Sequence, residues 1–307
     1  MSNKRVEQRR QQARQRQARL WVGGAVVVAL GLAGTWWATR GGTSSGGTPI
    51  GRVSANDFHS LAFSPTEPDT AFFGHHGGLM ASSDGGRTWQ ATTLQNADAM
   101  ALAALAAPAA DPQIMYAAGH GVFFKSSDGG TTWVSLIANL PGTDMHGFAA
   151  EPANANAVFA HVVGSGIWGS QDGGGTWTLL SSGAPPSTFN LAAGQDAQTL
   201  YAAAGESGPW RSQDGGRTWE RLATAPGDGV IAVAYHTAAQ RLFITTVGAE
   251  AGLYASEDDG STWSSLGLAG TFLALAASQQ DARRLLVVDE RGRVYGSTDG
   301  GLTWPAD

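Results

Sequence analysis

The first half of the chain holds histidine and aspartate at recurring positions. Three copies of the pattern D-x-[H/M]-x-[L/F]-A begin at Asp57, Asp98 and Asp144, and His-Gly pairs follow the first two. The candidate ligand-binding residues are Asp57, His59, His75, His76, Asp98, His120, Asp144 and His146. Imidazole and carboxylate groups suit a transition metal or a small ligand. The alternative for each histidine is a hydrogen-bonded core or turn residue.

The elements that would position these residues belong to a repeat. The box S-x-D-x-G-x-T-W starts at Ser82, Ser126, Ser170, Ser212, Ser256 and Ser297. Successive starts lie 41 to 44 residues apart, a period typical of repeat architectures. Aligned on the box, each repeat contains four short segments with the pattern of antiparallel strands, as in a propeller blade. Six boxes therefore predict an all-β, six-bladed β-propeller over residues 50–307.

We assign the boxes a structural role. The Asp carboxylate can accept backbone N–H groups inside the turn, the Gly permits a positive φ, and the Trp buries a large apolar surface. Calcium binding is the alternative, but one carboxylate per loop provides too few oxygen ligands. The structural residues are Asp84, Trp89, Asp128, Trp133, Asp172, Trp177, Asp214, Trp219, Asp258, Trp263, Asp299 and Trp304.

Blade topology sorts the polar residues onto two faces. The loop that enters strand one and the loop between strands two and three share one face, while the boxes lie on the other. The eight candidate histidines and aspartates of blades one to three fall on the face opposite the boxes. We expect a ligand site there. No cofactor is established, and the candidate is a divalent transition metal held by His59, His76, His120 and His146.

The two ends of the repeat region predict how the ring closes. Residues after Trp304 are too few for a full fourth strand in blade six. The extended segment at 49–55 is the one spare strand, and we expect it to pair there, which removes an exposed sheet edge.

The N-terminal residues predict a membrane anchor. Residues 1–19 are basic, residues 20–39 carry no charge, and residues 40–49 form a Gly/Ser linker. Twenty apolar residues span a bilayer as a helix, and the positive-inside rule places 1–19 in the cytoplasm. We expect a single-pass signal anchor in the cytoplasmic membrane with the propeller on the extracytoplasmic side. A cleaved signal peptide is the alternative.

Composition limits the partners. The chain has no Cys, which excludes disulfides and thiolate metal sites. Residues 41–307 hold 11 Lys/Arg and 24 Asp/Glu, and such an acidic body disfavours nucleic-acid binding. We expect a monomer attached to the membrane through residues 20–39, with a protein partner, small ligand or glycan on the propeller face.

The six boxes resemble the BNR or Asp-box repeats of sialidases, sortilin-type receptors, some glycoside hydrolases and photosystem II assembly-factor propellers. The resemblance covers about residues 50–307 and implies a propeller whose boxes face away from any active site. The family includes both enzymes and binding scaffolds, so it does not by itself decide the activity. Its assembly-factor and sortilin-type members imply protein partners.

Two functions follow from these residues. We favour a non-enzymatic binding or assembly scaffold. The alternative is a sialidase-like exo-glycosidase, which would need several arginines to hold a substrate carboxylate, a tyrosine nucleophile and an acid. A glycosidase with a carboxylate pair would instead need two acids facing each other across a cleft. The acids expected on the face opposite the boxes are Glu206, Glu250, Asp289 and Glu290. No arginine triad or F/Y-R-I-P element accompanies them, and no catalytic residue can be assigned.

Overall fold

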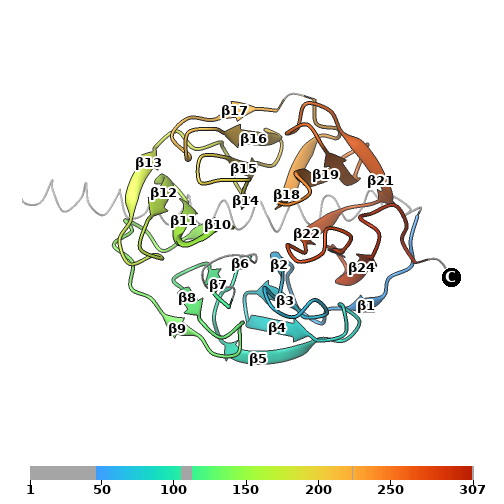
Figure 1. Ribbon diagram of the computed structural model, residues 1–307, viewed down its shortest axis with the longest axis horizontal. Helices are drawn as coiled ribbons and strands as arrows, with labels where there is room; N and C mark the ends of the chain where they lie inside the picture. Colours follow the sequence, from blue (N-terminus) through green and yellow to red (C-terminus); the bar gives the residue numbers. More distant parts are fainter. Residues whose placement is uncertain (1–45, 105–112, 223, 306–307) are drawn as a thin grey trace, which may run out of the picture. The chain divides into compact units, whose positions relative to one another are not determined.

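The computed structural model describes residues 46–104, 113–222 and 224–305, all within one compact unit. They form six four-stranded antiparallel sheets around a central axis (Figure 1). The predicted six-bladed propeller is thereby confirmed. The predicted anchor at 20–39, the tail at 1–19 and most of the linker at 40–49 lie outside the described residues. Within the part of the chain that the structure describes, no helix has the length and apolar character needed to cross a membrane.

Each blade takes four strands, and the first strand lies nearest the axis (Figure 1). Blades one and two contain β2 (Ser60–Phe63), β3 (Ala71–His75), β4 (Gly78–Ser82), β5 (Gln90–Gln95), β6 (Ala101–Ala104), β7 (Met115–Ala118), β8 (Phe123–Ser126) and β9 (Val134–Ser135). Blades three and four contain β10 (Met145–Glu151), β11 (Asn154–Val162), β12 (Gly166–Ser170), β13 (Thr178–Ser181), β14 (Asn190–Ala193), β15 (Leu200–Ala203), β16 (Pro209–Ser212) and β17 (Glu220–Arg221). Blades five and six contain β18 (Gly229–His236), β19 (Arg241–Val247), β20 (Gly252–Ser256), β21 (Ser264–Ala269), β22 (Phe272–Ala277), β23 (Leu285–Asp289), β24 (Arg293–Ser297) and β1 (Gly51–Arg52).

The hydrophobic core lies between the blades. Among the described residues it divides into six clusters, and each cluster joins residues of two adjacent blades. Between blades two and three, for example, Tyr116 and Phe123 pack against Phe148, with Trp177 at the edge of the same cluster. Each cluster contains one box tryptophan. The boxes therefore stabilise the contacts between blades, as their large apolar side chains predict.

The six boxes share one set of hydrogen bonds. In the second box, Ser126 Oγ donates to Asp128 Oδ1 over 2.8 Å and accepts from the N–H of Gly130 over 2.8 Å. Asp128 also accepts from the backbone N–H of Thr132 over 2.8 Å and from its hydroxyl over 2.6 Å. The same bonds recur in the other boxes, and the Gly at the fifth position has a φ between 86° and 94° in all six. The geometry is that of a hydrogen-bonded turn.

The N-terminal strand closes the ring. Strand β1 pairs antiparallel with β24, with Gly51 opposite Val294 and Arg52 opposite Arg293. The N–H groups of Ile50 and Val53 extend the pairing by donating to Val294 and Gly292, each over 2.8 Å. The expected pairing of segment 49–55 with blade six is confirmed.

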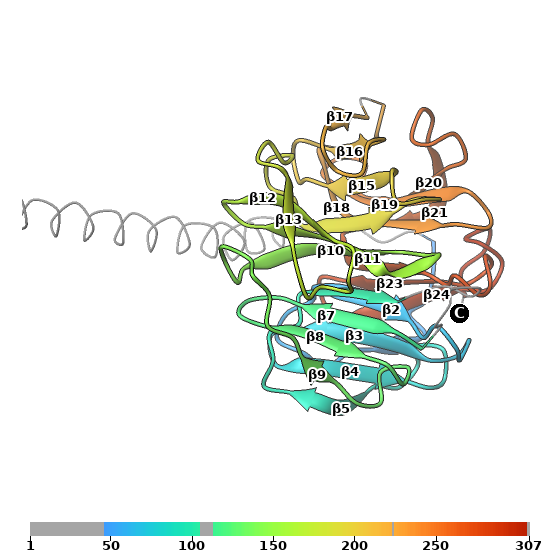
Figure 2. The same cartoon turned by 60° about the vertical axis from the view of Figure 1, so that its left-hand side comes forward.

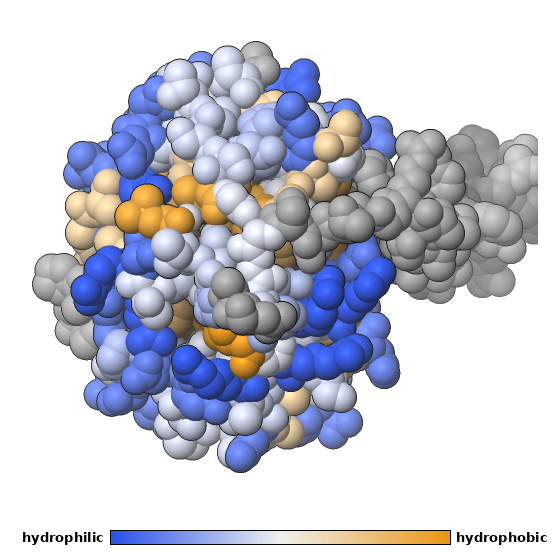
Figure 3. Space-filling model, turned by 90° about the vertical axis from the view of Figure 1, so that its right-hand side faces the viewer, coloured by the Kyte–Doolittle hydropathy of each residue, from blue (hydrophilic) through white to orange (hydrophobic). Residues whose placement is uncertain are grey.

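In the view turned by 60°, the blades are seen beside one another with their strands running across the ring (Figure 2). One side of the ring can be seen in a space-filling view (Figure 3). The side shown in Figure 3 is mainly hydrophilic, and its hydrophobic side chains gather in small patches. Exposed apolar side chains include Ile137 and Leu302, and single side chains of this kind are ordinary on protein surfaces.

Candidate functional site

Seven of the eight predicted ligand-binding residues form one continuous row across blades one to three. We call this set the His/Asp row. Its members, in order along the ring, are Asp57, His59, His76, Asp98, His120, Asp144 and His146. Consecutive imidazole rings have centroids 4.4, 5.9 and 5.2 Å apart. The face assignment made from the repeat thus places these side chains together, as expected.

The first part of the row lies within blade one. Asp57 receives the backbone N–H of His76 over 2.8 Å and lies 3.1 Å from its Nδ1 atom. Oδ1 of Asp57, which accepts this backbone N–H, is also 3.4 Å from Nε2 of His59, whereas Oδ2 is the atom near Nδ1 of His76. His76 is the most exposed histidine of the row, with 46% of its side chain accessible, and its Nε2 atom points toward Asp98 at 3.6 Å.

The second part of the row joins blades two and three. Nδ1 of His120 lies 2.7 Å from Asp98 Oδ2. On the opposite side of the same imidazole, Nε2 of His120 is 3.0 Å from Asp144 Oδ1 and 3.1 Å from Nε2 of His146. Asp144 Oδ1 is also 2.9 Å from Nε2 of His146. Three polar atoms from two blades therefore converge on one point.

Backbone contacts between neighbouring loops hold the row in place. His120 and Asp144 form an antiparallel bridge, and Gly121 donates its N–H to Thr143 over 2.6 Å. Gly119 allows a close approach within blade two, because a Cβ atom there would lie 1.7 Å from the carbonyl oxygen of Asp98. Backbone contacts therefore position both Asp98 and Asp144, the two carboxylates that lie on either side of the His120 imidazole.

A β-bulge shapes the third-blade end of the row. The register between β10 and β11 shifts between Met145 and Gly147, so His146 is the extra residue in the ladder. Equivalent bulges fall at Ile231 in blade five and Leu273 in blade six. Bulges commonly redirect a side chain at functional sites, and here the histidine is 94% enclosed, with 6% of its side chain exposed.

The pKa values of the histidines in the row are shifted in opposite directions. Burial lowers the pKa of His59 to about 4, and the nearby His76 adds to this effect, so His59 is neutral at pH 7. The carboxylates of Asp144 and Asp98 outweigh burial and raise the pKa of His120 to about 9. Burial opposes ionisation of Asp144, but the imidazoles of His120 and His146 lower its pKa overall. The His120–Asp144 contact is therefore an ion pair at neutral pH.

The remaining three histidines belong to none of the metal-compatible groups in the described residues, although His161 lies near enough to His146 for the charge of His146 to affect its pKa. His75 ends β3, where its Nδ1 accepts the N–H of Gly77 over 3.1 Å and its ring stacks on Phe73. It belongs to the end of the strand and is absent from every metal-compatible group among the described residues. His161, opposite Gly147 on β11, was not a sequence candidate; burial lowers its pKa to about 4. His236 donates no ligand atom to the row and accepts the N–H of Ala239.

Three groups in the described residues could hold a metal ion. The first is Asp57, His59 and His76, the second His76, Asp98 and His120, and the third His120, Asp144 and His146. The ligand atoms of each group lie within 4.8 Å of one another. The four predicted metal-binding histidines therefore divide among overlapping groups of three and do not form a single set in the described structure.

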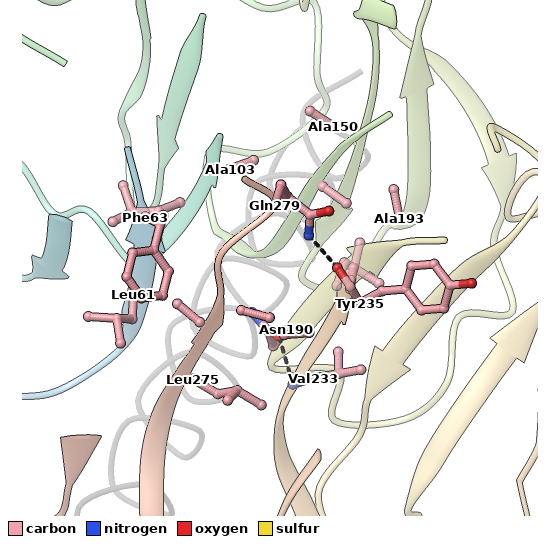
Figure 4. Close-up of a pocket in the computed structure, with 18 of the residues that line it drawn as sticks. Leu61, Phe63, Ala103, Ala150, Asn190, Ala193, Val233, Tyr235, Leu275 and Gln279 are labelled. Carbon is pink, nitrogen blue, oxygen red and sulfur yellow. Dashed lines mark hydrogen bonds between the residues drawn. The ribbon is translucent and has the colours of Figure 1, made fainter. Parts of the chain in front are cut away.

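The axis of the ring contains a separate cavity of about 120 Å³ (Figure 4). The first strands of the blades line it with apolar side chains such as Leu61 and Leu275. The side-chain amide of Gln279 donates to the carbonyl of Tyr235, and Asn190 Oδ1 accepts the N–H of Val233 over 3.0 Å. No residue of the His/Asp row lines this cavity, so the two features are distinct.

Two of the four candidate acids in blades four to six form hydrogen bonds with nearby backbone groups. Asp289 is buried and lies 2.6 Å from Nε of Arg293, and it accepts the backbone N–H of Arg291 over 2.9 Å. Glu250 accepts the N–H of Gly227 over 3.3 Å. These two candidates for a glycosidase carboxylate pair are thus engaged in structural hydrogen bonds.

Known proteins that resemble this chain are also β-propellers. The family model described as photosynthesis system II assembly factor YCF48 matches residues 53–307, whereas no curated protein matches the chain. A solved structure of YCF48 bound to D1 peptide is 18% identical, with a TM-score of 0.52, and the match covers 86% of this chain and 85% of that one.

Other propellers share the architecture. A GH74 xyloglucanase from Xanthomonas campestris is 18% identical with a TM-score of 0.58, and the match covers 84% of this chain but 46% of the enzyme. This chain thus spans about half the length of that enzyme. A nidogen/laminin complex is 13% identical with a TM-score of 0.62, covering 76% of this chain and 90% of the other. At these identities the likeness shows the fold alone.

Proposed function

The chain belongs to the photosynthesis system II assembly factor YCF48 family, and we propose that it acts as a non-enzymatic scaffold that binds a protein partner during assembly. The observation that carries this proposal is the His/Asp row, a continuous polar surface on one face of three adjacent blades. A solved member of the same family holds a D1 peptide, which supports an extended protein segment as the class of partner.

Charge complementarity narrows the partner further. The row contributes three carboxylates, Asp57, Asp98 and Asp144, whose side chains are between 21% and 41% exposed. The chain outside its first 40 residues is acidic as a whole. A partner segment with Lys or Arg side chains would gain charge-assisted hydrogen bonds along this row.

A membrane anchor would place this surface near membrane-bound partners. The uncharged run at 20–39, preceded by seven basic residues within 1–19, supports a single-pass anchor with the propeller on the extracytoplasmic side of the cytoplasmic membrane. The short linker at 40–49 would keep the ring close to the bilayer. A monomer suffices for this arrangement, because the candidate surface lies within one ring.

Site-specific photocrosslinking in native membranes tests the proposal. A photoreactive amino acid is placed in the full chain at His76, which is exposed on the row, and in a matched chain at Glu206, which is exposed on the same face in blade four. We expect a discrete protein adduct from position 76, weakened by Asp57→Asn, and none from position 206. Equal adducts from both positions would contradict a binding surface on blades one to three.

An activity assay of the same full chain distinguishes the scaffold role from glycoside hydrolysis. We expect no turnover on a panel of fluorogenic glycosides. Turnover that disappears in Glu206→Gln, Glu250→Gln or Glu290→Gln would instead support the carboxylate-pair enzyme.

A further inference from the structure

The point where blades two and three meet has the ligand arrangement of a metal centre. Nε2 of His120, Nε2 of His146 and Oδ1 of Asp144 lie 2.9 to 3.1 Å from one another. Donors bound to one ion at about 2.0–2.1 Å with tetrahedral angles would lie about 3.4 Å apart. A small outward movement of each side chain would therefore admit the ion.

Hydrogen bonds alone leave this point incompletely satisfied. Asp144 Oδ1 is inaccessible to solvent and has no hydrogen bond of acceptable geometry, although two imidazole nitrogens lie within 3.0 Å. Two Nε2 atoms that face each other can share one proton at most. A buried carboxylate oxygen without a donor is costly, and a cation among the three atoms would satisfy all of them at once.

The surroundings orient His120 as a ligand. Asp98 Oδ2 holds Nδ1 of His120 at 2.7 Å, which keeps a proton on Nδ1. A bound metal would displace the proton on Nε2, and the Nε2 lone pair would then be directed at the ion between Asp144 and His146. Histidines that bind metals usually donate their other ring nitrogen to a carboxylate in this way. The other two metal-compatible groups are less suited to an ion. Asp98 is already engaged by His120, and both nitrogens of His76 face carboxylates.

We propose that His120, Asp144 and His146 form a three-ligand site for a divalent transition metal, with zinc as the ion that best suits two imidazoles and one carboxylate. The side chains of His120 and Asp144 are 33% and 41% exposed, so the group lies at the surface, where water could supply a fourth ligand. His146 is enclosed and set by the bulge in β10. The site requires no protein partner.

Calorimetric titration of the metal-free full chain with Zn²⁺ alone tests the site. We expect one equivalent to bind the wild type, with affinity reduced more than about 100-fold in His146→Ala and in His120→Ala, since even outer-shell changes cost about 10- to 100-fold. His75→Ala, which changes a histidine outside the row, serves as the matched control and should bind as the wild type. Titration with Co²⁺ should give the visible absorption of a four-coordinate ion, and this absorption should be lost in Asp144→Asn.

Two results would overturn the assignment. One is the absence of Zn²⁺ binding by the wild type. The other is loss of binding in His59→Ala or in a variant with Asp57→Asn and His76→Ala, together with unchanged binding in His146→Ala. Circular dichroism of each variant establishes that it is folded, and Asp144→Asn provides a nearly isosteric change if an alanine variant unfolds. Because partner crosslinking is read at position 76, outside this group, failure of either proposal can be recognised separately.

Discussion

Nδ1 of His120 lies 2.7 Å from the carboxylate of Asp98, a residue in the loop that enters the same blade. This contact decides which nitrogen of His120 faces the neighbouring blade. It makes Asp98 a positioning residue, since it acts on Asp144 and His146 only through the imidazole between them.

Replacing Asp98 should therefore weaken metal binding without removing a ligand. In Asp98→Asn the neutral amide no longer holds the Nδ1 proton as firmly, and we expect Zn²⁺ affinity to fall about 10- to 100-fold. Calorimetry measures the change. Asp57→Asn is the matched control, because Asp57 contacts His59 and His76 but not His120, and an equal loss in both variants would argue against a specific role for Asp98.

The close approach at Gly119 should be intolerant of a side chain. A Cβ atom there would lie 1.7 Å from the backbone oxygen of Asp98, so Gly119→Ala must displace the loop and should cost about 1–3 kcal/mol of unfolding free energy. Denaturant titration measures it. Gly183→Ala, where the nearest side-chain atom is 3.9 Å away, should change stability by less than about 0.5 kcal/mol; similar values for both would refute the steric explanation.

The buried box serine should contribute more to the free energy of unfolding than the exposed serine beside it. Ser126 is 1% exposed and its hydroxyl accepts the buried N–H of Gly130 over 2.8 Å. Ser126→Ala leaves this donor unpaired and should cost about 1–3 kcal/mol. The exposed neighbour Ser127 offers the control Ser127→Ala, which we expect to be nearly neutral. Chemical unfolding of the two variants in parallel distinguishes them.

The box carboxylates predict acid sensitivity. Hydrogen bonds from Thr132 lower the pKa of Asp128 to about 2, and those from Thr262 and Thr303 act in the same way on Asp258 and Asp299. A carboxyl group whose pKa is lower in the folded state stabilises the fold above its unfolded-state pKa, and this contribution is lost as pH falls through the folded value.

Melting temperature should accordingly be insensitive to these groups above about pH 4 and should fall between about pH 4 and 2. Thermal unfolding followed by circular dichroism across this range measures the effect. In Asp128→Asn the fall should be shallower, because one titrating group is absent. A melting temperature that rises on acidification would contradict the assigned direction.

Ring closure by β1 should govern resistance to association. A chain of residues 54–307 lacks β1 and exposes the edge of β24, whereas a chain of residues 46–307 retains the pairing. We expect the shorter chain to melt at lower temperature and to associate as its concentration rises, because unpaired edge strands pair between molecules. Size-exclusion chromatography and thermal unfolding of the two chains provide the comparison, and identical behaviour would show that the pairing contributes little.

The propeller was predictable because its determinants are local and repeated. Box residues such as Asp128 bond within five positions of themselves, so the five shared residues of the eight-residue box give the same turn six times. Once the turns are assigned, strand order and face follow from antiparallel geometry, which is why the His/Asp face could be located in advance.

The internal arrangement of the row was not predictable in the same way. His75 and His76 are adjacent in sequence and both were candidate ligand-binding residues, although only His76 was a candidate metal ligand. Strand β3 continues through His75 and the turn begins after it, so His76 is the one that reaches Asp57. The bulge at His146 and the engagement of Asp98 by His120 depend on contacts between neighbouring loops. Aligned positions identify a shared face, but side-chain rotamers and ring curvature determine which atoms meet.

The pairing of β1 with β24 has a consequence for the order of folding. Arg52 and Arg293 are partners in the ladder although almost the whole propeller separates them along the chain. During synthesis the first strand must remain without its partner until β24 has left the ribosome, while local hairpins form at once. Such long-range pairing is slow, so ring closure is expected to be a late kinetic step, and a nascent chain stalled before β24 would be especially vulnerable to proteases and dependent on chaperones.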